Sequence, residues 1–328
     1  MQNKGSKILK YVISGTLAVV LLFFAFSGVD WAAFSDGLKG ANWWWVTVSM
    51  ACGICAFWFR GVRWKGILSP LDPSVRAGEC FASVNLANLS NLVIPYSGEL
   101  VRCGIISDRH RNPGTRYDKV LGTVVLERAW DMLSIILIIL LLLVLQWQRF
   151  GAFFTQNIWN PLSARLGGAT GIVAGAIILA GMAFMAAVIG LRKRPGIFSK
   201  IYNAIEGLLN GFSSCLRMDR KWLFLLYTAI IWTMYWLQIV FIFKALGLGD
   251  LGLADALFIM AVGSIASFVP VPGGFGAYHY LVALAMSALY GFPWESGILI
   301  ATLAHESQAL TMIVSGTVSG AFLQARKK

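Results

Sequence analysis

The sequence contains two apolar stretches, residues 86–102 and 261–277, that are each interrupted by proline and glycine and then resume. An offset of 175 residues superimposes Pro95 on Pro270 and Gly98 on Gly273. Such a break inside lipid frees backbone N–H and C=O groups, which only protein or a water-filled cavity can satisfy. Interrupted helices at matching places in two halves of a chain are typical of a transporter's substrate site.

The composition is that of an integral membrane protein, since 58% of the residues are hydrophobic and only 13% are charged. Spanning a bilayer takes about 20 apolar residues. We expect six spanning helices, in the uninterrupted runs 7–27, 43–63, 119–146, 167–191, 222–246 and 296–322. The first run is too long for a cleaved signal core and is expected to be retained. The interrupted segments 76–107 and 253–290 are expected to form two helical hairpins, so the predicted fold class is an all-α, polytopic membrane bundle.

We interpret residues 1–328 as a single integral membrane domain. Its halves are expected at about 41–146 and 222–322, joined by residues 147–221. Within this connection, apolar residues at near-helical spacing predict an interfacial helix near 195–217.

Basic residues predict the orientation. If each hairpin returns to the face that it entered, 22 of the 27 Lys and Arg residues fall on one side. We expect a multi-pass protein of the cell inner (plasma) membrane. The positive-inside rule then places both of its termini in the cytoplasm. The hairpins would open to opposite sides as re-entrant halves of an inverted-topology repeat. The alternative is that each hairpin is a kinked pair of ordinary helices.

The net charge of +12 does not indicate nucleic acid, because charge in short cytoplasmic loops is what topology alone requires. Among the five cysteines, the pair Cys52 and Cys55 lies in an apolar run and is interpreted as packing. We expect no disulfide, no metal and no cofactor. His305 and Glu306 do not begin an H-E-x-x-H motif, since Ala309 stands where the second His would be.

Charged residues inside the run 119–146 need partners, because each unpaired one would cost about 2.5–3.5 kcal/mol near the bilayer centre. Arg128 and Asp131 are three residues apart and can pair. Glu127 and Asp131 are four apart and repel unless a second cation intervenes. We expect Arg128 to pair with Asp131 or Glu99, and Arg102 to pair with Glu127 or Glu99.

The first hairpin carries a polar stripe, Asn85, Asn88 and Asn91, followed by Ser97 at the break. Such a stripe avoids lipid. It forms either hydrogen bonds between helices or a hydrophilic groove for a lipid headgroup. In the second half His279, His305 and Glu306 are expected to play the comparable part, although a lone intramembrane histidine is often only an interhelical contact. The candidate substrate-binding residues are Asn85, Asn88, Asn91, Pro95, Ser97, Glu99, Arg102, Glu127, Arg128, Asp131, Pro272, Gly273, Gly274, His279, His305 and Glu306.

Three motifs occur in a characteristic order: Gly98-Glu99-x-x-Arg102, Glu127-Arg128-x-x-Asp131, and Pro270-x-Pro272-Gly273-Gly274-Phe275-Gly276. Together they resemble the membrane domain of the lysylphosphatidylglycerol synthetase and flippase superfamily, over about residues 41–320. The resemblance implies a bundle with re-entrant helices and a role in moving or handling lipids. The soluble aminoacyl-transferase domain of larger members is expected to be absent.

The sequence departs from that family at two positions, with His279 where the family commonly has Glu and His305 where it commonly has Arg. This double change predicts that the two positions face each other. It also argues against a cationic aminoacylated lipid as the substrate.

We expect a lipid translocase and not an enzyme, acting on a phospholipid, glycolipid or polyprenyl-linked lipid. One alternative is an intramembrane lipid-modifying transferase that uses Glu127, Asp131 or His305 as a base. Another is a non-catalytic partner of a lipid- or glycolipid-synthesis enzyme. Association with such an enzyme and homo-oligomerisation are both compatible with the sequence.

Overall fold

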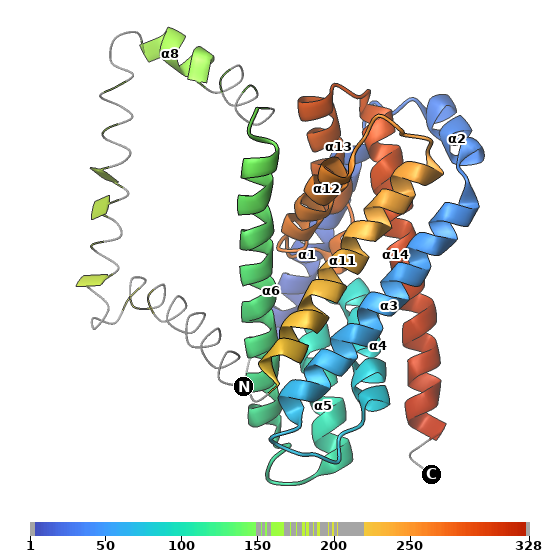
Figure 1. The fold of residues 1–328 in the computed structure, drawn as a ribbon, viewed down its shortest axis with the longest axis vertical. Helices are drawn as coiled ribbons and strands as arrows, with labels where there is room; N and C mark the ends of the chain where they lie inside the picture. Colours follow the sequence, from blue (N-terminus) through green and yellow to red (C-terminus); the bar gives the residue numbers. More distant parts are fainter. Residues whose placement is uncertain are drawn as a thin grey trace.

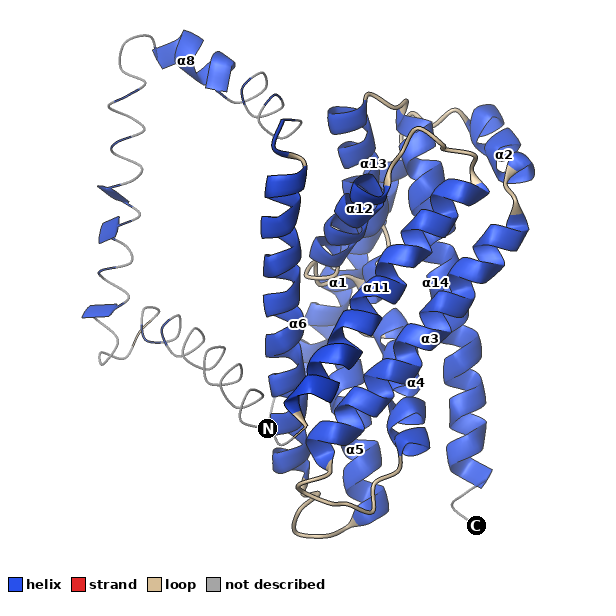
Figure 2. Cartoon of the chain, viewed as in Figure 1, coloured by secondary structure: helices blue, strands red, loops and turns tan. Residues whose placement is uncertain are grey.

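The protein is described by a computed structural model that covers residues 4–148, 160–166 and 220–325, with isolated positions between 149 and 219. All regular elements in these residues are helical, which confirms the all-α fold class (Figure 2). The expected span at 167–191 and the interfacial helix near 195–217 lie outside the described residues, apart from isolated positions. Between α6 (Tyr117–Leu145) and these two segments, the structure describes one short helix, α8 (Asn160–Leu166).

Four helices are long and apolar enough to cross a membrane: α3 (Trp43–Leu68), α6 (Tyr117–Leu145), α11 (Lys221–Ala245) and α14 (Trp294–Ala325). They confirm four of the expected spans. The first span differs from expectation, because α1 (Lys4–Phe26) is followed by an unexpected helix, α2 (Trp31–Gly40), bent by 89° from it. The described residues therefore hold four spans, or five if this bent pair counts as one, and the sixth expected span, 167–191, lies outside them.

The first interrupted segment folds into α4 (Ala77–Val93) and α5 (Ser97–His110), which pack against each other. The base of this hairpin, where α4 begins and α5 ends, is held together by Glu79 in the first turn of α4. This carboxylate accepts a hydrogen bond from the backbone N–H of Arg76 at 3.1 Å and lies 3.3 Å from the Nε2 atom of His110 in the last turn of α5. The two legs therefore begin and end at the same end of the bundle.

The loops beside this base are joined through Asp72. Its carboxylate accepts hydrogen bonds from the Ser74 hydroxyl at 2.6 Å, from the Ser74 backbone at 2.9 Å and from the Asn112 amide, and lies 3.2 Å from Nδ1 of His110. The Ser74 hydroxyl is the largest of the influences that hold the pKa of Asp72 below its ordinary value. The loop after α3 and the loop after α5 are thereby tied together.

The second interrupted segment consists of α12 (Leu253–Ala266), a short 3₁₀ turn η3 (Pro272–Gly274) and α13 (Ala277–Tyr290). Asp255 closes its base in the same manner. The carboxylate accepts hydrogen bonds from the Gly252 backbone at 2.8 Å, from the Tyr290 hydroxyl at 2.9 Å and from the Gln146 side chain at 2.8 Å. The first turn of α12 and the last turn of α13 are therefore held together.

The tips of the two hairpins meet between the two ends of the bundle. The Tyr96 hydroxyl, in the break of the first hairpin, donates to the backbone carbonyl of Phe268 at 2.8 Å and lies 3.4 Å from that of Ser267, in the break of the second. A Cβ atom added at Gly273 would meet the Leu92 side chain at 3.0 Å. In Figure 1, α4 and α5 occupy the lower end of the bundle, whereas α12 and α13 occupy the upper end.

The main apolar core joins α3, α11, α12, α13 and α14, and its most deeply buried members are Ile242, Ala256, Ile259, Val282, Met286 and Ala301. α3 and α11 pack along much of their length. The four cysteines that the structure describes, Cys52, Cys55, Cys80 and Cys103, are free thiols.

Close packing at the first tip generates a prediction about Gly98. A Cβ atom there would overlap the carbonyl group of Ala87 on α4. Gly98→Ala should therefore destabilise the protein by about 1–3 kcal/mol, as overpacking does. The measurement is the midpoint of thermal unfolding in detergent. Gly104→Ala is the matched control on the same helix, since nothing lies within 4 Å of its added Cβ; equal midpoints for the two variants would contradict the close approach.

Candidate functional site

An ion-pair network surrounds Glu127, which lies on α6 and is fully buried. One carboxylate oxygen accepts a hydrogen bond from Arg102 of α5 at 2.6 Å. The other accepts from Arg63 of α3 at 3.1 Å, and the Nε atom of Arg60 lies 3.8 Å from it. Three helices therefore converge on one carboxylate, which is compensated on both oxygens.

Arg63 is the second cation that Glu127 and Asp131 require. Its Nη2 atom donates to Asp131 at 2.7 Å as well as to Glu127, and its Nη1 atom donates to Thr228 of α11 at 3.1 Å. Arg128 lies 2.7 Å from Glu99 and 3.7 Å from Asp131. These contacts, with that between Arg102 and Glu127, confirm the pairing predicted for Arg128 and Arg102.

Arg60 and Arg63 were not predicted to belong to the site, because the apolar run was ended at residue 63 and both were counted with the cytoplasmic charges. The helix α3 continues to Leu68, so both arginines lie inside the bundle, at 9% and 1% exposure. The apolar residues that follow the two arginines could have indicated that the helix continues. Trp64 and Ile67 continue the helical face and are buried.

The network carries an excess of positive charge. Four arginines, at positions 60, 63, 102 and 128, face three carboxylates, at positions 99, 127 and 131. The cluster therefore has one more cation than anion among the residues that the structure describes there.

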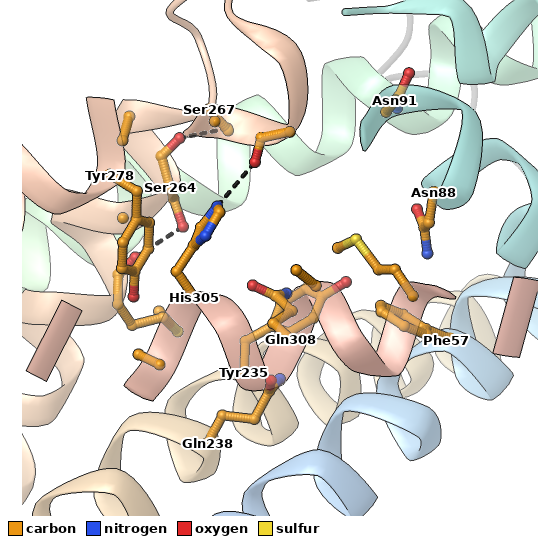
Figure 3. A pocket seen from close by; sticks show the side chains of 18 of the residues that line it. Phe57, Asn88, Asn91, Tyr235, Gln238, Ser264, Ser267, Tyr278, His305 and Gln308 are labelled. Carbon is orange, nitrogen blue, oxygen red and sulfur yellow. Dashed lines mark hydrogen bonds between the residues drawn. The ribbon is translucent and has the colours of Figure 1, made fainter. Parts of the chain in front are cut away.

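A cavity of about 310 Å³ lies beside this network, between the hairpin tips and helices α3, α6, α11 and α14. Arg60, Arg128 and Asp131 form part of its wall. Figure 3 shows Asn88 and Asn91 on one side of it and Tyr278 and His305 on another.

Asn88 provides a free hydrogen-bond donor in this wall. Its residue is only 7% exposed, and its amide nitrogen is buried without a hydrogen-bond partner. Buried polar groups are normally paired. A polar ligand in the cavity would supply that missing partner.

The predicted asparagine stripe serves partly as an interhelical contact and partly as cavity wall. Asn85 does not line the cavity; it donates to the Ser319 hydroxyl of α14 at 3.0 Å and acts as an interhelical contact. Asn91 lines the cavity and also accepts from the Gly98 backbone at 2.7 Å. The hydroxyl of Ser97, the first residue of α5, lies 2.5 Å from the Ser90 hydroxyl.

The second half contributes a compact group of side chains from α13 and α14. His279 Nε2 lies 3.3 Å and His305 Nδ1 lies 3.2 Å from the same oxygen of Glu306. The two imidazole rings are 5.1 Å apart, which confirms that these positions face each other. His305 Nε2 is 2.8 Å from the Gly273 carbonyl oxygen, the contact drawn as a dashed line in Figure 3. These three side chains are positioned so that they could hold a metal ion.

Within the second tip, Gly273 and Gly274 line the cavity at positive φ, 58° and 79°. Pro272 begins the turn that orients them but is not itself part of the wall. Glycine adopts this backbone region without steric cost, which lets the turn approach the cavity.

Further polar side chains of the wall were not predicted from the sequence. They come from α11, α12 with the residue that follows it, α13 and α14, and are Tyr235, Gln238, Ser264, Ser267, Tyr278 and Gln308. The available signal was a polar group within an apolar run, as for Gln238 and Gln308. These residues were passed over because an uncharged side chain costs far less in lipid than a charged one.

Long apolar helices, a buried ion-pair network and a polar cavity between two hairpin tips define a polytopic membrane protein with an internal polar site. The chain belongs to the family described as the lysylphosphatidylglycerol synthase TM region, whose model matches residues 8–316. This family is associated with lipid modification and translocation. Comparison with curated proteins and with solved structures gives no match to this chain.

The network predicts a large difference between two arginine variants. Arg63→Ala leaves Glu127 and Asp131 with less compensation in a buried site, which typically costs about 3–5 kcal/mol. Arg111→Ala removes a contact with Asp108 in which the arginine side chain is 77% exposed, so the midpoint of unfolding should hardly change. Thermal unfolding of both variants in detergent is the measurement. Similar small shifts would show that Arg63 is not required by the network.

Proposed function

We propose that the protein is a lipid translocase, which carries a polar headgroup through the cavity between the hairpins while the acyl chains remain in the bilayer. The observation that carries the proposal is the position of a polar, cation-rich cavity among long apolar helices. Polar groups within a membrane bundle mark substrate pathways by default, because they are expensive to maintain.

The dimensions of the hairpins support a re-entrant arrangement. Their legs are 14–17 residues long. At 1.5 Å per residue this is roughly 21–26 Å, less than the ~30 Å of a hydrocarbon core. Each base is closed by a carboxylate, and the hairpins approach from opposite ends of the bundle. These features favour an inverted repeat in which neither hairpin crosses the membrane.

We place both termini in the cytoplasm and the first hairpin open to that side. The support is the distribution of basic residues: of the 22 Lys and Arg residues assigned to one face, 19 remain there once the buried Arg60, Arg63 and Arg102 are left out. In Figure 1, α1 starts and α14 ends toward the same end of the bundle as the base of the first hairpin.

The chemistry of the wall favours a headgroup that contains phosphate. The network has an excess arginine, and guanidinium groups recognise phosphate by paired, charge-assisted hydrogen bonds. Asn88 offers a further donor. A volume of about 310 Å³ is at the lower end for a ligand pocket and suits a headgroup without its acyl chains. A cationic headgroup would be repelled by the same excess charge, so we propose a phospholipid as substrate.

Translocation requires the cavity to open to one leaflet at a time. The closed tips, joined by Tyr96, represent the barrier between the two sides. Movement of one hairpin away from the other would open the cavity, and the closed bases would keep each hairpin attached to its own end.

The test is a transport assay on purified protein in sealed vesicles. Fluorescent phosphatidylglycerol and phosphatidylethanolamine are compared with a labelled glycolipid that lacks phosphate, and a membrane-impermeant quencher reports the label remaining outside. We expect the phospholipids to cross and the glycolipid to remain. Chemically altered label would contradict the proposal in favour of a lipid-modifying transferase. Label neither moved nor altered would contradict it in favour of a non-catalytic partner.

Two cavity variants sharpen the assay. Arg128→Ala and Asn88→Ala remove donors to the phosphate, and loss of a hydrogen bond to a charged group, about 1.5–3 kcal/mol, corresponds to a decrease of about tenfold or more in the transport rate. Arg116→Ala is the control, since this arginine side chain is 69% exposed beside Asp118. Equal transport rates in all three variants would remove the cavity from the pathway.

A further inference from the structure

Three ligand-type atoms converge where α13 meets α14. They are Nε2 of His279, Nδ1 of His305 and an oxygen of Glu306, and all three lie within 4.8 Å of one another. Both histidines are buried, at 1% and 6% exposure, whereas the Glu306 side chain is 44% exposed. The group is therefore fixed by packing on two sides and open on the third.

The hydrogen bond of His305 determines which of its nitrogens carries a proton. Nε2 lies 2.8 Å from the Gly273 carbonyl oxygen, which can only accept. In the neutral ring Nε2 is consequently the donor, and Nδ1 presents a lone pair to the Glu306 carboxylate at 3.2 Å. Two acceptors face each other at hydrogen-bond distance.

His279 approaches the same carboxylate from α13. Its Nε2 atom lies 3.3 Å from the same Glu306 oxygen, and its Nδ1 atom is buried without a hydrogen-bond partner. Nε2 either donates its proton to this oxygen or, in the other tautomer, directs a lone pair at it and is free to bind a cation. A cation between the three atoms removes the repulsion and satisfies each of them.

We propose that His279, His305 and Glu306 form a binding site for a divalent transition-metal ion of the Zn²⁺ type. Tetrahedral ligands that bind zinc at about 2.0–2.1 Å lie roughly 3.3 Å apart. The two distances from histidine to glutamate are 3.3 and 3.2 Å, as such a site requires. The ligand atoms of the two histidines lie within 4.8 Å of each other, so a bound ion would draw these side chains together. Two imidazoles and one carboxylate favour zinc over magnesium or calcium, which prefer oxygen ligands.

The surroundings supply the support that metal-binding histidines normally have. The ring nitrogen opposite the ligand atom usually donates to a carbonyl or carboxylate, which orients the ring and strengthens the ligand. The Gly273 carbonyl does this for His305. Three protein ligands leave a fourth position for a water molecule or another oxygen ligand. Because His305 also lines the cavity, that position is near the cavity wall.

The third histidine of the sequence provides a natural comparison. The nitrogens of His110 face two different carboxylates, Asp72 at 3.2 Å from Nδ1 and Glu79 at 3.3 Å from Nε2. Since these atoms are on different sides of the ring, a single ion cannot bind both pairs. His110→Gln is therefore the matched control for a histidine substitution.

The experiment uses the full chain in detergent, stripped with a chelator and titrated with Co²⁺ as a spectroscopic probe and with Zn²⁺ in competition. We expect one ion per chain and the intense visible absorption of tetrahedral Co²⁺, abolished by stoichiometric Zn²⁺. His279→Gln, His305→Gln and Glu306→Gln should each weaken binding by about tenfold or more, since even lost outer partners of a metal site cost 10–100-fold. His110→Gln should bind as the unmodified protein does.

Three results would overturn the proposal: no stoichiometric binding, binding unchanged in the triad variants, or binding lost only in His110→Gln. Thermal unfolding identifies a histidine variant that does not fold. Glu306→Gln, at the most exposed of the three positions, then decides the question. The measurement involves no lipid, so its outcome is independent of the transport assay.

Discussion

The structure depends on the neutralisation of one buried carboxylate, that of Glu127. A charge in this position is costly unless both of its oxygens are compensated. Arg102 binds one oxygen and Arg63 the other, which fixes α5 and α3 against α6. Arg63 then extends the network to Thr228 on α11. The position of the first hairpin relative to the second half of the chain, and with it the shape of the cavity, follows from these few contacts.

The sequence predicted those parts of the site that are governed by strong local penalties. Arg128 and Glu127 had to be paired because unpaired charges are rejected by lipid, and the partners proposed for Arg128 and Arg102 are those observed. Arg63 was misassigned because the end of α3 depends on the loop held by Asp72, a contact with Asn112 forty positions away. Asn85 was assigned to the groove because spacing alone does not distinguish a cavity from the Ser319 hydroxyl on another helix.

The histidine group has a similar explanation. The H-E-x-x-H motif can be recognised in a sequence because its two histidines lie four positions apart on one helix. His279 and His305 lie on different helices and are brought together by the packing of α13 on α14. By contrast, the hairpins could be predicted, because proline and glycine within apolar runs act locally. Both hairpins also place an acid in the first turn, Glu79 and Asp255, which caps the helix and closes the base.

The contact between the two tips is made to main chain, since Tyr96 donates to a carbonyl oxygen of the opposite break. Every amino acid supplies such an oxygen. Residues 267 and 268 can therefore change during evolution without loss of the contact, provided that the backbone path of the turn is kept. Only the tyrosine, on one side of the contact, has to keep its identity. The two halves of the chain are in this way free to diverge in sequence while their meeting point persists.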